Sequence, residues 1–308
     1  MVRARAAILR EFGRQFDIDY VDINAEGNDV IVKVKSVGVC GRDIVVWRGG
    51  FRNLKPPLVL GHEVFGVTED GEPVGVYPAD PGSEEFLPLG ERRPGGYAEL
   101  MAAPRSNIVR LPDEEFDKYA AATCGVATLI HASRVVGVRP GDRVLVTGAS
   151  GGVGIHGVQY LSNVLHANVI AYVRSKEKAH VLEGLGVSVV TDLSFYRSLG
   201  RVDYVFEIVG APLINESMRS LRRGGELVLV GNVTGEPISI ERPALLVMRE
   251  LKISGTSAYT KSEYEEAVKL IGEGLVKPFY KAYRLDDVNL AYSDILNGKA
   301  LGRAVLKP

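Results

Sequence analysis

The chain has 308 residues, of which 46% are hydrophobic and 24% charged, a composition typical of folded globular proteins rather than disordered or fibrous ones. Its 37 lysines and arginines nearly balance 38 aspartates and glutamates, so the net charge of −1 excludes the strongly basic surface that nucleic acids or anionic membranes attract. We therefore expect a small-molecule partner and neither a nucleic-acid nor a membrane partner.

The ends of the chain and its cysteines indicate the compartment. The first five residues run into a mixed-charge stretch without the apolar core of a signal peptide. Residues 144–173 carry no charged side chain, but their glycines, histidines and amide side chains exclude a transmembrane helix. Two cysteines in this length fit a reducing environment, so we expect a cytoplasmic protein.

Short β-type runs occupy the first 112 residues. Residues 30–34, 64–67 and 72–76 are rich in valine and are separated by glycine, proline and asparagine. Closely spaced strands with turn residues between them predict a compact, mostly β domain.

Strands alternate with helical segments from about residue 113 to residue 256. Between the first two predicted strands, Ile155, Val158, Leu161 and Leu165 recur at helical spacing and would face the sheet. This alternation favours a parallel sheet with right-handed crossovers. The strands are predicted at residues 143–147, 168–173, 188–191, 204–209, 227–231 and 251–255.

The last segment begins near residue 258. A helix over residues 262–274 leads into strands at 281–285 and 302–306. Because this segment is too short to fold alone, we expect it to return to the first domain. The sequence thus predicts an α/β protein with a mostly β domain (1–124 and 259–308) and a doubly wound parallel-sheet domain (125–258).

A glycine-rich turn follows the strand at 143–147. Residues 144–154 read VLVTGASGGVG: a buried strand, a tight turn and the start of an amphipathic helix. Gly151 would let the backbone approach a pyrophosphate, and Gly154 would let the helix pack close to the strand. A purely structural turn is the alternative; the complete strand–turn–helix context and the second strand ending near Val173 favour a dinucleotide site.

The end of that second strand bears on the choice of nucleotide. An NAD site usually has Asp or Glu there, to bind the ribose hydroxyl, whereas this chain has Val173-Arg174-Ser175-Lys176 and no acid before Glu177. Arg174 would bind a 2′-phosphate and Ser175 would donate a hydrogen bond to it. NADPH is therefore favoured over NADH. The alternative is that Arg174 and Lys176 are solvent-exposed charges at the start of a helix and bind no phosphate.

Four residues far apart in sequence have the side chains that zinc prefers. Cys40, His62 and Cys124 offer two thiolates and an imidazole, and Glu63 offers an exchangeable carboxylate. Asp43 would orient His62. Spacing alone does not establish a metal site, because a surface Gly-His-Glu turn and two inert core cysteines would give the same pattern.

The order of these motifs resembles the zinc-type medium-chain dehydrogenase/reductase superfamily, over essentially the whole chain. The residues that carry the resemblance are 38–43 (GVCGRD), 61–63 (GHE), Cys124 ahead of Thr128, and 150–154 (SGGVG). Residues 40–43, 148–156 and 230–233 are similar to an archaeal branch that includes acryloyl-CoA reductase.

The resemblance implies a GroES-like β domain holding one catalytic zinc, a Rossmann domain, a cleft between them, and a homodimer or homotetramer. It implies zinc at Cys40, His62 and Cys124, with Glu63 as a fourth or transient ligand. It also implies nucleotide contacts from Thr128, Ser150, Gly151, Gly152, Val153, Arg174, Ser175, Lys178, Val230, Gly231, Asn232 and Arg303.

The chain departs from the superfamily at two places. Zinc-type alcohol dehydrogenases often hold a structural zinc in a lobe of four cysteines, but residues 77–96 contain none, so we expect no structural zinc. The usual hydroxyl two residues after the first ligand and the histidine five after it are here Arg42 and Val45. This disfavours facile alcohol oxidation, and Arg42 could instead hold an anionic part of cofactor or substrate.

Three functions compete at this point. The leading one is a zinc-assisted, NADPH-dependent oxidoreductase acting at the carbonyl or alcohol carbon of a small apolar substrate, with Cys40, His62, Cys124 and Asp43 in the catalytic site. The second keeps the fold and cofactor but reduces an activated C=C bond, as quinone oxidoreductases or acryloyl-CoA reductase do. The third is a nucleotide-binding protein without catalysis.

Overall fold

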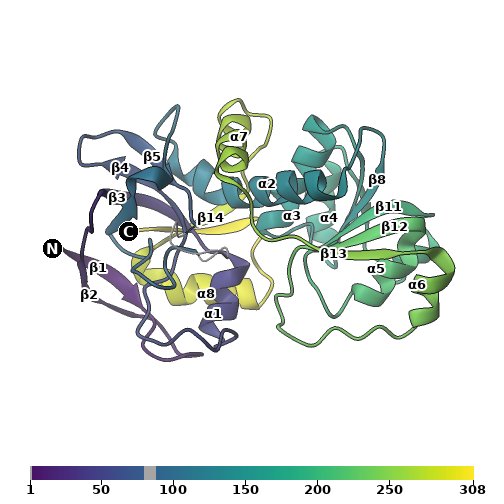
Figure 1. Cartoon of the computed structure of the whole chain (residues 1–308), viewed down its shortest axis with the longest axis horizontal. Coiled ribbons are helices and arrows are strands. Elements are labelled where there is room, and N and C mark those ends of the chain that lie inside the picture. Colours follow the sequence, from purple (N-terminus) through teal and green to yellow (C-terminus); the bar gives the residue numbers. More distant parts are fainter. Residues whose placement is uncertain (1, 80–87) are drawn as a thin grey trace. The chain divides into compact units, whose positions relative to one another are not determined.

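The structure is a computed structural model that describes residues 2–79 and 88–308, and the chain divides into two compact units (Figure 1). The first unit comprises Met1–Cys124, Tyr264–Glu273 and Pro278–Pro308, and the second comprises Gly125–Glu263 and Gly274–Lys277. Residues 259–263 and 274–277, which the predicted bounds include in the β domain, lie in the second unit, where Glu263 contacts His131 and Lys277 exchanges hydrogen bonds with Gln159. The functional domain bounds stay a prediction.

A seven-stranded mixed sheet and a two-stranded antiparallel ribbon form the first unit. The large sheet has the strand order β14-β15-β3-β4-β5-β7, and β6 also pairs with β3. The strands are β1 (Val2–Ile8), β2 (Asp17–Ile23), β3 (Asp29–Gly38), β4 (Glu63–Thr68), β5 (Pro73–Val76), β6 (Leu100–Pro104), β7 (Ile108–Arg110), β14 (Tyr280–Arg284) and β15 (Arg303–Lys307).

Few helices accompany these strands. Two of them, α2 (Phe116–Val136) and α7 (Lys261–Gly272), contribute residues to both units. The first unit also contains α1 (Gly41–Trp47), α8 (Val288–Leu296) and the 3-10 turns η1 (Arg105–Asn107) and η4 (Leu285–Asp287).

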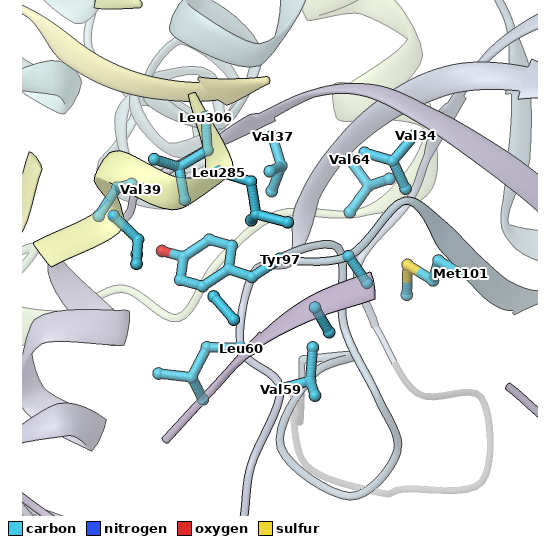
Figure 2. Packing of buried hydrophobic residues seen from close by; sticks show 14 of the residues in the cluster. Val34, Val37, Val39, Val59, Leu60, Val64, Tyr97, Met101, Leu285 and Leu306 are labelled. Carbon is cyan, nitrogen blue, oxygen red and sulfur yellow. The ribbon is translucent and has the colours of Figure 1, made fainter. Parts of the chain in front are cut away.

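The core of the first unit surrounds Tyr97, which is fully buried. Figure 2 shows its ring among Val39, Leu60 and Leu285, which come from segments far apart in sequence. Along β3 the side chains of Val32 and Val34 are buried while Lys33 between them is exposed, the alternation of a strand with one solvated face. Toward Gly38 the strand becomes buried on both faces, which brings the following residues into the interior.

A six-stranded parallel sheet is the centre of the second unit. Its strand order is β10-β9-β8-β11-β12-β13, so the chain runs outward from β8 in one direction and then returns to begin again at β11. The topological switch point therefore lies between β8 and β11. The strands are β8 (Arg143–Val146), β9 (Asn168–Tyr172), β10 (Ser188–Val190), β11 (Val202–Glu207), β12 (Leu221–Leu229) and β13 (Lys252–Gly255).

Right-handed crossovers in opposite directions place helices on opposite faces of this sheet. Figure 1 shows α5 and α6 on one face and α3 on the other. The connections are α3 (Gly152–Gln159), the π-turn η2 (Tyr160–Val164), α4 (Lys176–Glu183), the 3-10 turn η3 (Phe195–Arg197), α5 (Ile214–Ser220) and α6 (Pro243–Arg249).

The predicted α/β fold class is confirmed, and the individual strands fall close to their predicted ranges. One exception is β12, which begins at Leu221 rather than at residue 227. Leu221 pairs with Val202, the register then shifts across the Arg-Arg-Gly-Gly run at 222–225, and pairing with β11 resumes at Glu226. Part of the predicted loop at 77–96 lies outside the described residues. Within residues 2–79 and 88–308, no helix is both long and apolar enough to cross a membrane.

Candidate active site

Four side chains of the first unit converge at one point. Cys40 caps the N-terminus of α1, His62 and Glu63 lie at the start of β4, and Cys124 lies on α2. One potential ligand atom from each falls within 4.8 Å of the others. His62, Glu63 and Cys124 are buried, and Cys40 is partly buried.

Strand register explains why residues so far apart meet. In the antiparallel pair of β3 and β4, Gly38 lies opposite Glu63. Cys40 follows Gly38 by two residues and His62 precedes Glu63 by one, so both emerge at the same end of the pair. Helix α2 packs closely against Gly38: the main-chain oxygen of Ala120 lies 2.4 Å from the ideal Cβ position on Gly38. Cys124 follows Ala120 by about one helical turn and so lies near the same point.

Asp43 ties two of these residues together. One carboxylate oxygen lies 3.2 Å from Nδ1 of His62, and the other accepts the backbone N–H of Cys40 at 2.8 Å. With Nδ1 facing Asp43, His62 has Nε2 left for another partner. Behind Asp43, the buried hydroxyl of Tyr97 donates a hydrogen bond at 3.1 Å to the same oxygen that Cys40 uses.

Electrostatics distinguish the two thiols. A hydrogen bond from Cys124, together with the nearby His62, holds the pKa of Cys40 well below its usual value although burial opposes this. That same hydrogen bond and burial raise the pKa of Cys124. Burial lowers the pKa of His62, but the Asp43 carboxylate outweighs it and the pKa lies well above its usual value. Cys40 is thus the first of the two thiols to become a thiolate.

Glu63 provides the test of whether a cation fits here. Burial raises the pKa of Glu63 to about 8, although Arg303 lowers it. Nη2 of Arg303 lies 3.1 Å from Oε1 of Glu63, yet neither carboxylate oxygen has a hydrogen-bond partner. Two thiols, one imidazole nitrogen and a buried carboxylate whose oxygens accept no hydrogen bond are the donor set of a tetrahedral zinc site. The residues therefore fit zinc.

Arg303 contacts residues of the candidate metal centre, which the sequence did not predict. It is 4% exposed, donates a hydrogen bond to the main-chain oxygen of Val39 and faces Glu63. A predicted nucleotide contact is thus a buried neighbour of the candidate metal centre. Its role toward a nucleotide stays a prediction.

The glycine-rich segment forms the predicted strand, turn and helix. Gly148 has φ +60°, in the left-handed region, and Gly151 caps α3, so Ser150 to Val153 lie at that helix's N-terminus. A Cβ atom on Gly154 would lie 2.4 Å from the main-chain oxygen of Gly148. Only glycine at 154 permits this approach of helix to turn.

Apart from Thr128 on α2, the remaining nucleotide candidates of the second unit follow the carboxyl ends of β9 and β12. Arg174 follows β9 and is exposed, and the side chain of Ser175 caps α4 by accepting the N–H of Lys178 at 3.3 Å. Burial and the neighbouring Arg174 lower the pKa of Lys178. Val230, Gly231 and Asn232 follow β12, and Thr128 is buried on α2.

The surroundings of two residues, Arg42 and Glu207, were not predicted from the sequence. Arg42 does not project freely: its guanidinium donates two hydrogen bonds to Glu91, at 2.5 and 3.0 Å, and lies 4.5 Å from the ring centre of Phe51. Glu207 is fully buried at the end of β11. A carboxylate directly after the apolar run Val205-Phe206 was the signal that could have drawn attention to Glu207.

The fold and site define a two-unit oxidoreductase with a thiol–imidazole–carboxylate centre. Family models match as an alcohol dehydrogenase GroES-like domain over residues 26–113 and a zinc-binding dehydrogenase over residues 152–273. The chain belongs to the zinc-type medium-chain alcohol dehydrogenase superfamily, in which the archaeal acryloyl-CoA reductases are among its relatives.

Individual relatives span almost the whole chain. An acryloyl-coenzyme A reductase of Sulfurisphaera tokodaii is 32% identical over 91% of this chain and 92% of its own length. An alcohol dehydrogenase of Geobacillus stearothermophilus is 30% identical over 98% of this chain and 99% of its own length. The structure of a cobalt- and zinc-bound thermostable alcohol dehydrogenase from Pyrobaculum aerophilum superposes with a TM-score of 0.90 at 25% identity, covering 100% of both chains.

Proposed function

We propose that this oxidoreductase is zinc-assisted and NADPH-dependent, and transfers hydride between the nicotinamide and the carbonyl or alcohol carbon of a small apolar substrate. The observation that carries the proposal is the convergence of Cys40, His62, Glu63 and Cys124 within 4.8 Å. We assign the metal chemistry to the mostly β domain (1–124 and 259–308) and nucleotide binding to the parallel-sheet domain (125–258).

In this proposal Cys40, His62 and Cys124 hold one catalytic zinc, and Glu63 is a fourth or transient ligand. When bound, zinc supplies a Lewis acid for the substrate oxygen. Asp43 accepts the Nδ1 proton of His62, so the imidazole presents Nε2 and keeps one orientation. Cys40 releases its proton first because Cys124 donates a hydrogen bond to it.

The nucleotide site in this proposal follows the carboxyl edge of the parallel sheet. The N-terminus of α3, with Ser150 to Val153, binds the pyrophosphate, and Arg174, Ser175 and Lys178 bind the 2′-phosphate. The exposed Arg174 beside Lys178 supports NADPH over NADH, because two neighbouring cations favour a doubly charged phosphate. Thr128 and the 230–232 strand tip complete the site.

A second candidate reaction is the NADPH-dependent reduction of an activated C=C bond. Two relatives named acryloyl-coenzyme A reductase, 32% and 28% identical, support it. So does Arg42, because its side chain is paired with Glu91 and has no hydroxyl with which to pass an alcohol proton to solvent.

One experiment separates these candidates. The purified chain is analysed for zinc and its NADPH consumption is followed with a panel of ketones and aldehydes and a panel of enones and enoyl thioesters. We expect one zinc per chain and turnover on the carbonyl panel; turnover on the unsaturated panel alone would establish the second candidate. Cys40→Ala should lose both zinc and carbonyl turnover, and a zinc-free wild-type protein with full activity would refute the metal role.

We also propose a homodimer or homotetramer and a cytoplasmic location. The second unit supports self-association: β13 is an edge strand of the sheet, and neighbouring α6 exposes Val247 and Met248, each 78% accessible. Two free cysteines fit a reducing compartment. Light scattering of the wild-type protein and of Met248→Lys tests the assembly, since a charge on this face should yield monomers.

A further inference from the structure

A buried carboxylate lies where the two halves of the parallel sheet meet. Glu207 ends β11 and Thr147 follows β8, so the two residues lie on either side of the topological switch point. Open parallel sheets bind their ligands outside the carboxyl ends of the strands at this point. Glu207 is therefore beneath the place where the nucleotide of the proposed function would bind.

The Glu207 carboxylate accepts hydrogen bonds from four donors. The hydroxyl of Thr147 donates to Oε1 at 2.6 Å, and the N–H groups of Val209 and Gly210 donate to the same oxygen at 3.0 Å each. The hydroxyl of Ser217, on α5, donates to Oε2 at 2.5 Å. The two main-chain N–H groups can only donate and the two hydroxyls can donate as well, so an ionised carboxylate satisfies all four, although burial raises the pKa of Glu207.

The main chain of Glu207 extends these connections to a third strand. Its carbonyl oxygen accepts the N–H of Val230 at 2.9 Å and the N–H of Gly231 at 3.2 Å, just beyond β12. The N–H of Ile208 in turn donates to the Thr147 hydroxyl at 3.0 Å. One residue thus fixes the ends of β8, β11 and β12 relative to one another.

The turn held by this carboxylate touches two of the candidate nucleotide elements. A Cβ atom on Gly148, in the glycine-rich turn, would lie 3.1 Å from the side chain of Val209. A Cβ atom on Gly210 would lie 2.5 Å from Oδ1 of Asn232. Displacing residues 209–210 would therefore move both the glycine-rich turn and Asn232.

We propose that Glu207 is the positioning residue of the nucleotide site, acting through Thr147 and the 208–210 turn. The inference rests on the proposed function, because it presumes that a nicotinamide dinucleotide binds at this sheet edge. Glu207 contacts no part of the reaction itself. Its negative charge would, by electrostatics alone, repel the phosphates, so it acts by arranging the backbone that receives them.

Glu207→Gln tests the proposal on the full chain. The amide keeps the size of the side chain but removes the charge and replaces one acceptor oxygen by a donor-only NH2, so the hydrogen bonds at that position are lost or must reverse. We expect the Kd for NADPH, measured by the fluorescence of the bound cofactor without substrate, to rise about tenfold, and KM for NADPH to rise with little change in kcat. Glu226→Gln on β12, with the same charge change at a half-buried position, should leave the Kd unaltered.

A second variant keeps the test decisive if Glu207→Gln does not fold. Thr147→Val preserves the shape of the side chain and removes only the bridging hydroxyl; we expect its Kd for NADPH to rise about threefold. Unchanged or tighter NADPH binding in the folded variants would overturn the positioning role, even if their melting temperatures fell. A wild-type protein that binds neither NADPH nor NADH would overturn the proposed function itself and this inference with it.

Discussion

Gly38 is the position at which adding one methyl group should disturb the candidate metal centre most. A Cβ atom there would lie 2.1 Å from Oε2 of Glu63 and 2.4 Å from the main-chain oxygen of Ala120. Glu63 has little space to move, because it is 3% exposed and lies beside Arg303. The Ala120 oxygen belongs to α2 and retreats only if the helix moves.

The size of the effect follows from these overlaps. A normal carbon–oxygen contact of about 3.5 Å requires α2 to move away from β3 by about 1 Å. Overpacking of this kind costs about 1–3 kcal/mol, and two simultaneous overlaps place Gly38→Ala near 3 kcal/mol, or about 6–12 °C in melting temperature. Because Cys124 is one turn after Ala120, its sulfur moves too, and we expect zinc affinity to fall about tenfold.

Two measurements check this reasoning: thermal unfolding, and the transfer of zinc to a chromogenic chelator. Gly255→Ala is the matched control, because Gly255 also lies in a strand and no atom falls within 4 Å of its ideal Cβ position. If Gly38→Ala melts and retains zinc as Gly255→Ala does, the packing of β3 against α2 does not position the metal ligands.

Three further predictions concern other parts of the molecule. Arg174→Ala should raise KM for NADPH about tenfold and leave KM for NADH nearly unchanged in steady-state assays; equal effects would contradict a 2′-phosphate contact. Tyr97→Phe removes the hydrogen bond to Asp43 and should speed zinc release about threefold in the chelator assay, whereas an unchanged rate would exclude this support. Burial raises the pKa of Asp113, but hydrogen bonds led by that from Lys118 lower it below 3.8 overall. Asp113→Asn should therefore lower the melting temperature at neutral pH, and the difference should shrink only as the pH falls below about 3.8, through the pKa of the folded state.

The candidate nucleotide site was largely predictable because its signals are local. Residues 144–154 combine a buried strand, turn glycines and an amphipathic helix within a few positions, and the structure contains these elements in this order. The same holds for Arg174 and Ser175, which follow the second strand directly. Local conformation depends on neighbouring residues, so the sequence carries it explicitly.

The partners of isolated charged residues were not predictable. Arg42 was considered as a group for binding an anion, yet it pairs with Glu91, which is 49 positions later. Arg303, predicted to contact the nucleotide, pairs with Glu63, which lies 240 positions earlier, and the sequence did not indicate this partner. A charged side chain in a sequence shows that a partner is needed if the residue is buried, but not which residue supplies it.

The amino-acid sequence by itself determined the α/β class, the glycine-rich strand–turn–helix segment and the presence of one set of side chains of the types that bind zinc, because turn chemistry, periodicity and residue type are local properties. Only the tertiary structure decided that Cys40 and His62 emerge together, since this depends on the pairing of Gly38 with Glu63 in register. It also decided that Glu207 connects three strand ends, because strands distant in sequence become neighbours only when the sheet forms.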